Sequence, residues 1–193
     1  MMDALISWFG ADAAKTVAFA ILSGVAGFFA KGFYDIWLAQ RKDRLDRVNQ
    51  QLKLLYGPLY ALDRANNLAW TAFRSRTRPE GSFFETLPPP NQEELEMWRR
   101  WMRTIFQPIH NEMLSLITTN ADLLIDDDLP ESLQLFCAHV TAYRVVFERW
   151  SENDFAEHRS VINYPTEEMA AYLTRSFRLL KSQQRRLLGP RSA

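Results

Sequence analysis

The chain has little cysteine, little glycine and no excess of charge. Its 193 residues include one cysteine, Cys137, so no disulfide can form within the chain, and a lone thiol suits a reducing compartment. Glycine, proline and β-branched residues are sparse outside a few connectors, whereas Leu, Arg, Glu, Gln and Met are common, which favours an all-α fold. The 23 basic and 23 acidic side chains balance, so no global field attracts nucleic acid.

Patterns that carry catalysis or metal binding are missing as well. His110 and Glu112, like Cys137 and His139, stand two residues apart and so point to different sides of a helix. There is no His-Glu-x-x-His, no glycine-rich phosphate loop and no nucleophile elbow. The sequence therefore predicts no catalytic residue, no cofactor and no metal site. An enzyme that uses Cys137 or a histidine is the least favoured alternative.

The sequence contains one long apolar run, from Val17 to Leu38. A membrane-spanning helix needs about 20 predominantly apolar residues, and residues 16–30 carry no charge. Residues 39–56 carry five basic and two acidic side chains, a bias that places this side of the span in the cytoplasm. We therefore expect a single-pass anchor over residues 1–38 in the cell's inner (plasma) membrane, with residues 39–193 as a cytoplasmic body.

Three alternatives compete with an anchor. A cleaved signal peptide would begin with basic residues and end in small ones, and this run has neither feature. A helix buried in a soluble core remains open, because the uncharged centre is only fifteen residues long. A helix lying in the membrane plane would need a strongly polar face, which the segment lacks.

Within the apolar run, small residues recur at helical spacing, which lets two membrane helices approach closely. These candidate packing residues are Ala20, Ser23, Gly24, Gly27 and Ala30. Lys31 and Asp35 stand four apart on one face and form a candidate intramembrane polar pair.

The body is expected to be an antiparallel four-helix bundle, because four long amphipathic patterns are separated by short connectors. The predicted helices cover about residues 39–76, 91–120, 130–150 and 166–188. Gly57-Pro58 should kink or stop the first helix, Asn91 should cap the second, and residues 126–130 should close the second and cap the third. Gly189-Pro190 should end the fourth.

Two surfaces of the first body helix are candidates for contacts with other chains. An apolar seam with spacings of three and four residues is typical of a coiled coil or the edge of a bundle. It consists of Leu45, Val48, Leu52, Leu55 and Leu59. At the end of this helix, Arg74, Arg76 and Arg78 form a possible docking surface for a partner.

These observations favour a non-enzymatic, membrane-anchored interaction or scaffold module that associates with itself and with a protein partner. The alternative is a membrane effector, in which a cytoplasmic bundle senses a signal and the membrane helices oligomerise to perturb the bilayer. The polar pair Lys31 and Asp35 would suit such a pore.

Overall fold

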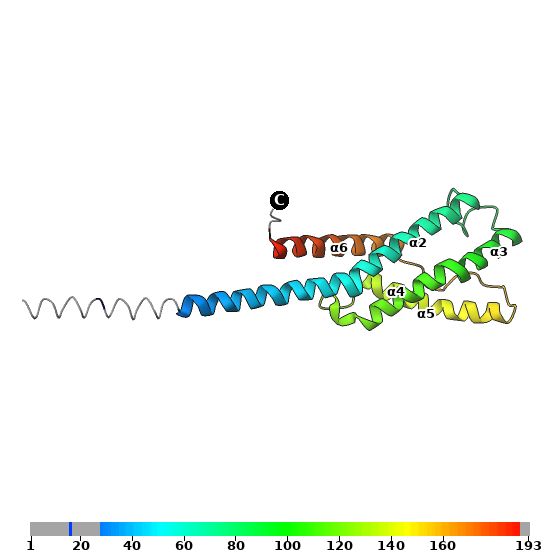
Figure 1. Ribbon diagram of the computed structural model, residues 1–193. Helices are drawn as coiled ribbons and strands as arrows, with labels where there is room; N and C mark the ends of the chain where they lie inside the picture. The colour runs from blue at the N-terminus through cyan, green and yellow to red at the C-terminus, as the bar shows by residue number, and fades with distance from the viewer. Residues whose placement is uncertain (1–15, 17–27, 190–193) are drawn as a thin grey trace, which may run out of the picture. The chain divides into compact units, whose positions relative to one another are not determined.

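The computed structural model describes residue 16 and residues 28–189 of the chain. Its described part is predominantly helical and contains no strand, so the all-α prediction is confirmed (Figure 1). The chain divides into two compact units, Met1–Asp46 and Arg47–Ala193. We call these the N-terminal unit and the helical unit.

The N-terminal unit is helical from residue 28 to its end and exposes most of its large apolar side chains. Phe28, Phe33 and Trp37 expose 77, 71 and 52% of their surface. Within the described residues, no helix combines the length and apolar character that a membrane crossing requires. Residues 17–27 of the expected span, with the packing residues Ala20, Ser23, Gly24 and Gly27, lie outside the described part.

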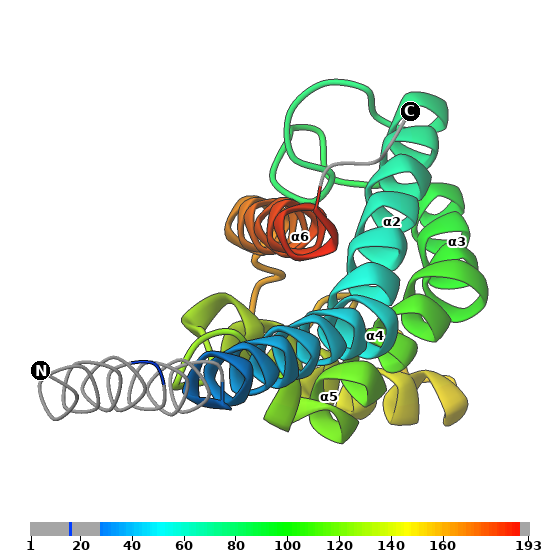
Figure 2. The same cartoon turned by 60° about the vertical axis from the view of Figure 1, so that its left-hand side comes forward.

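In the helical unit, residues 47–50 are helical and lead into the remaining elements. The α-helices are α2 (Gly57–Arg76), α3 (Gln92–Trp101), α4 (Gln107–Thr119), α5 (Glu131–Ser151) and α6 (Thr166–Leu188). Two π-helical segments, η1 (Gln51–Tyr56) and η2 (Met102–Phe106), and the 3-10 turn η3 (Ala121–Leu123) complete the unit. Helix α2 packs against α4 and α6, and α5 packs against the same two helices (Figure 2).

Each π-helical segment leads directly into an α-helix whose second residue is a proline. Gly57 and Gln107 donate their N–H groups to carbonyls five residues back, those of Leu52 and Met102. Proline has no N–H and its ring crowds the carbonyl four residues back, and the wider turn accommodates both effects. The sequence predicts a kink or a stop at Gly57-Pro58; the first helix does not stop there but continues from η1 into α2 through a π-helical turn.

Helix ends follow the predicted local signals at Asn91 and Gly189, but only in part at residues 126–130. The Asn91 side chain accepts from the Glu94 N–H, and the Glu94 carboxylate accepts from the Asn91 N–H, so the predicted cap is a full capping box. Gly189 ends α6 with a φ of 81°. The expectation for residues 126–130 was wrong in part: α4 already ends at Thr119, and the Asp126 carboxylate accepts from the Tyr172 hydroxyl at 2.7 Å instead of capping α5.

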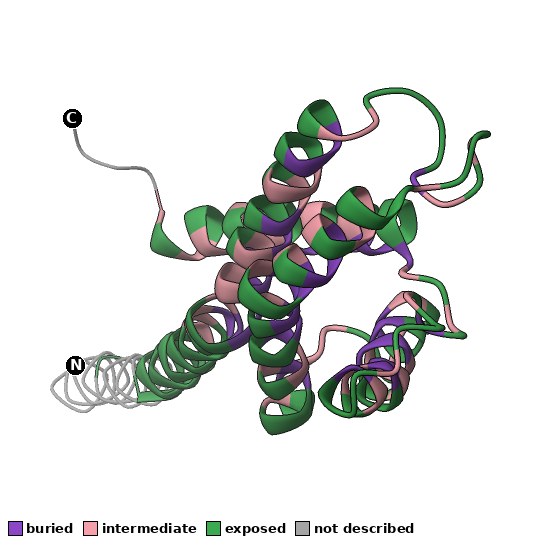
Figure 3. Cartoon of the chain, turned by 90° about the vertical axis from the view of Figure 1, so that its right-hand side faces the viewer, coloured by how far each residue is buried: buried purple, intermediate pink, exposed green. Residues whose placement is uncertain are grey.

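The buried hydrophobic residues form two clusters, and Figure 3 marks the buried positions along the helices in purple. The first is mainly aliphatic and joins η1 and α2 to α4, α5 and α6. It contains the seam residues Val48, Leu55 and Leu59, of which the two leucines are fully buried. The seam from Val48 onward therefore packs within the chain's own core. The second cluster is aromatic and includes Phe73, Phe83, Trp98, Phe106 and Trp150.

Candidate ligand cavity

A cavity of about 710 Å³ lies where the aromatic cluster meets the last turns of α2. Its walls come from α2, the connector of residues 77–91, α3, η2, α4, α5 and the segment 159–166. Distant parts of the sequence therefore build one site inside the helical unit.

One wall of the cavity is a continuous set of aromatic rings. The Trp70 and Trp98 rings meet edge to face with centroids 5.9 Å apart, and the Phe83 and Phe84 rings pack against Trp98 at 5.8 and 5.4 Å. Phe83 is buried although it belongs to the 77–91 connector, so this connector is part of the core. The result is an apolar wall of aromatic rings packed largely edge to face along the cavity.

Hydrogen bonds fix the connector of residues 152–165 beside this wall. The Trp98 indole and the Tyr143 hydroxyl both donate to the His158 carbonyl, at 2.8 and 2.7 Å. The Trp150 indole donates to the Glu157 carbonyl at 2.8 Å. These bonds position the residues that follow, including Tyr164 at the polar end of the cavity.

The polar end of the cavity brings His110, His139 and Tyr164 together. The ring of His110 stacks on that of Tyr164 with centroids 5.1 Å apart, and it meets His139 edge to face at 5.9 Å. His110 Nε2 lies 3.1 Å from Asn66 Oδ1, and His139 Nδ1 lies 2.6 Å from the Ile162 carbonyl. Because both oxygens only accept, these ring nitrogens carry the protons.

His110 Nδ1 and the Tyr164 hydroxyl, with Asp63 Oδ1 near Tyr164, are buried polar atoms without a hydrogen-bond partner among the described residues. The other Asp63 oxygen accepts from the Asn67 amide at 3.2 Å. A buried polar atom without a partner typically costs about 1–3 kcal/mol. Such atoms are therefore rare in structural cores and common where a ligand or ordered water binds.

Burial controls the protonation of these groups. Desolvation, followed by the neighbouring His139, lowers the pKa of His110 to about 3, so its ring is neutral at physiological pH. Desolvation also lowers the pKa of His139 and raises that of Asp63. The pKa of Tyr164 is raised by burial and, to a smaller degree, by the charge of Asp63. The polar end therefore presents neutral histidine and tyrosine groups.

The hydrogen-bond partners of the two histidine rings among the described residues are the Asn66 side-chain amide and the Ile162 backbone carbonyl. In the described part of the chain, neither His110 nor His139 hydrogen-bonds to a carboxylate or to a nucleophile. No group of three His, Cys, Asp or Glu side chains among these residues could hold a metal ion. Cys137 is half-buried, and burial raises the pKa of its thiol, which leaves it protonated and unreactive.

The three arginines expected to form a docking surface have different roles. Arg74 is buried and donates to the carbonyls of Glu80 and Gly81. Arg78 pairs with the Glu94 carboxylate through two bonds of 2.9 Å and also donates to three carbonyls of the 77–91 connector. Only Arg76 is exposed. Two of the three guanidinium groups therefore hold this connector in place.

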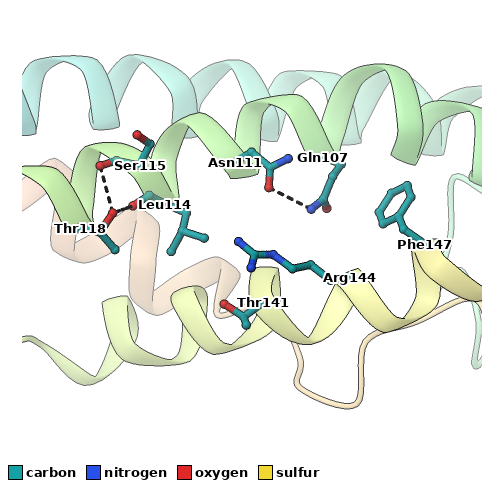
Figure 4. A pocket seen from close by; sticks show the side chains of 8 residues that line it. All are labelled: Gln107, Asn111, Leu114, Ser115, Thr118, Thr141, Arg144 and Phe147. Carbon is teal, nitrogen blue, oxygen red and sulfur yellow. Dashed lines mark hydrogen bonds between the residues drawn. The ribbon is translucent and has the colours of Figure 1, made fainter.

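A second hollow, a groove of about 730 Å³, runs between α4 and α5 (Figure 4). Arg144 reaches across it from α5 toward α4, where the Gln107 amide donates to Asn111 Oδ1 at 3.1 Å. Thr118 and Thr141 donate to carbonyls of their own helices. Most of the groove's polar groups are thus engaged within single helices, and the cavity remains the stronger candidate site.

The sequence did not reveal the cavity residues Asn66, His110, His139 and Tyr164. They lie on α2, α4, α5 and the connector before α6, and only tertiary packing brings them together. The one available signal was that His110 and His139 occur within otherwise apolar helical patterns.

Comparison of the chain with protein-family models, with characterised proteins and with solved structures gives no match. The geometry of the chain itself therefore carries the functional argument.

Proposed function

We propose that this protein is a non-enzymatic interaction module held at a membrane by its N-terminal segment. In this proposal residues 1–38 anchor the chain as a single-pass helix in the inner (plasma) membrane. The remaining residues form a cytoplasmic, antiparallel helical bundle that binds a protein partner and associates with a second copy of the chain.

One observation carries the membrane attachment: the exposed aromatic residues of the N-terminal unit. Phe29 and Tyr34 expose 59 and 60% of their surface. Phe28, Phe33 and Trp37 are also more than half exposed. Exposed apolar surface of this density is unusual in a soluble protein and indicates a contact with a membrane or a partner. Aromatic side chains at the end of an uncharged run suit the headgroup region of a bilayer.

The membrane effector remains a second candidate because of Lys31 and Asp35. Both side chains are exposed and stand one helical turn apart. Ionisable residues in a membrane segment usually mark a functional path and face other helices. An effector would release a dye from vesicles into which the chain is reconstituted, whereas a scaffold would not.

The experiment that tests the anchor is fractionation of cells that express the full chain. We expect the wild-type protein in the membrane pellet after carbonate extraction. The double variant Leu22→Lys and Val25→Lys should move to the supernatant, because each charge at the centre of a bilayer costs about 2.5–3.5 kcal/mol. The matched control, Lys42→Gln and Arg44→Gln, lies outside the run and should stay in the pellet. Wild-type protein in the soluble fraction without detergent would contradict the proposal.

A further inference from the structure

We propose that the cavity binds a small organic monoanion, an apolar body that ends in one carboxylate, and that the buried Arg74 guanidinium supplies the counter-charge. The inference concerns the helical unit alone. It goes beyond the proposed function, because it does not depend on how the chain attaches to a membrane.

Arg74 is a buried charge that no acid of the described chain neutralises. The residue is 8% exposed and lines the cavity. Its Nη2 donates to the carbonyls of Glu80 and Gly81, which carry no formal charge. Among the described residues, no carboxylate forms an ion pair with this guanidinium. A buried charge is costly unless it is paired, so the site favours an anion from outside the chain.

The guanidinium also keeps donors free for such an anion. An arginine side chain has five N–H donors, and both carbonyl bonds of Arg74 start from Nη2. Within the described residues, its Nε and Nη1 make no hydrogen bond, yet neither is a fully covered atom, as Arg99 Nη1 is. An anion in the cavity can therefore reach them. Hydrogen bonds between ionised groups are roughly twice as strong as those between neutral ones.

The other charges of the cavity lining cancel. Arg159 pairs with Glu85 at 3.3 Å, and desolvation lowers the pKa of both His110 and His139, which leaves the two rings neutral at physiological pH. No other described residue that lines the cavity is charged, so Arg74 leaves an excess of one positive charge. A single carboxylate balances this excess, whereas a phosphate ester carries a charge of about −1.5 to −2.

Partly exposed apolar side chains offer a surface to the body of the ligand. Trp70, Phe84 and Ile162 line the cavity and keep part of their surface accessible. The Arg74 guanidinium lies over the Trp70 ring, 5.7 Å from its centroid, so a carboxylate on Arg74 places its body beside this wall. The volume of about 710 Å³ lies within the range of about 300–1,000 Å³ that is common for small-molecule sites.

Three probes test this chemistry on the full chain in detergent. 4-Nitrobenzoate combines an apolar ring with one carboxylate, 4-nitrobenzamide is its uncharged counterpart, and acetate has the charge without the ring. The nitro compounds are followed by quenching of tryptophan fluorescence, because Trp70 and Trp98 line the cavity, and acetate is followed as a competitor. We expect a Kd on the order of 1 mM for 4-nitrobenzoate. 4-Nitrobenzamide and acetate should each bind at least about 10-fold more weakly.

Substitutions on α2 test the role of Arg74. Arg74→Gln should weaken 4-nitrobenzoate about 10- to 100-fold, because it removes the charge from the hydrogen bonds. Arg74→Lys keeps the charge and should retain more binding than Arg74→Gln. The matched control is Arg76→Gln, which removes the same charge from an exposed position of the same helix outside the cavity and should change nothing. Near-UV circular dichroism checks that each variant keeps its tertiary structure.

Equal binding of 4-nitrobenzoate and 4-nitrobenzamide to the wild-type chain would overturn the inference, whatever the folding of the variants. So would 4-nitrobenzoate binding that Arg74→Gln leaves intact, equally strong competition by acetate, or no quenching by 4-nitrobenzoate at about 10 times the expected Kd. None of these outcomes bears on carbonate extraction, so failure here and failure of the membrane proposal are distinguishable.

Discussion

His110 is the residue whose burial most directly couples stability to pH. Its pKa is about 3 in the folded chain, whereas an unfolded histidine titrates near 6.5. A proton therefore binds the unfolded state more tightly, and stability is fully present above pH 6.5 and decreases as the pH falls toward 3. The lowered pKa of His139 acts in the same direction.

We predict that the free energy of unfolding of the full chain in detergent decreases between pH 6.5 and 4. One such proton contributes a slope of at most about 1.4 kcal/mol per pH unit. His110→Gln should reduce this slope, as measured by urea unfolding at several pH values. A slope that the variant leaves unchanged, or stability that increases on acidification, would show that His110 is accessible to protons in the folded state.

Among single residues, the sequence identified the helix caps but not the cavity. The Asn91 cap depends on a carboxylate three residues later, and Gly189 ends α6 through its own positive φ, so both signals are local. The pairing of His110 with Asn66 joins residues 44 positions apart. No local pattern encodes such a contact, because it follows from which helices pack together.

Among the helical elements, η1 depends on a glycine for its geometry. A Cβ at Gly57 would lie 2.3 Å from the Leu52 carbonyl oxygen, the same oxygen that accepts the Gly57 N–H. Backbone atoms cannot move aside as a side chain would. The sequence showed that Gly57-Pro58 interrupts the pattern, but it could not show that a π-helical turn would carry the helix through it.

We predict that Gly57→Ala destabilises the helical unit by about 1–3 kcal/mol, the usual range for overpacking, despite the better helix propensity of alanine. Urea unfolding measures this change. The control is Gly32→Ala, where a Cβ would meet nothing within 4 Å, and the unfolding of the helical unit should not respond. Equal effects of the two substitutions would mean that the π-helical turn adapts without strain.

For the molecule as a whole, burial of the seam determines where self-association can occur. Leu55 and Leu59 are fully buried in the chain's own core, so they offer no surface to a second copy. The sequence pattern could not tell whether the seam packs inside the chain or against a second copy, because the same spacing occurs in a coiled coil and in an internal core. The small residues of the apolar run remain the candidates for contact between copies.

We therefore predict different effects of two changes on the mass of the detergent-solubilised complex. Gly24→Leu with Gly27→Leu should reduce the mass toward that of a monomer, because bulky side chains separate the helix backbones. Leu55→Ala should leave the mass unchanged but lower the free energy of unfolding by about 2–5 kcal/mol. Light scattering with detergent correction measures the first effect, and a lower mass for Leu55→Ala would place the seam between copies.

The hydrogen bond between the Tyr56 and Tyr172 hydroxyls, 2.8 Å long, joins the first and last parts of the helical unit. The two residues are 116 positions apart, and Gln184 bonds to Asn49 across 135. At about 5–20 residues per second, a ribosome needs on the order of 6–20 s to make the chain between the two tyrosines. During that time Leu55 and Leu59 have been synthesised but their α6 partners have not. The nascent chain therefore presents apolar surface to chaperones or to premature aggregation until α6 has been synthesised.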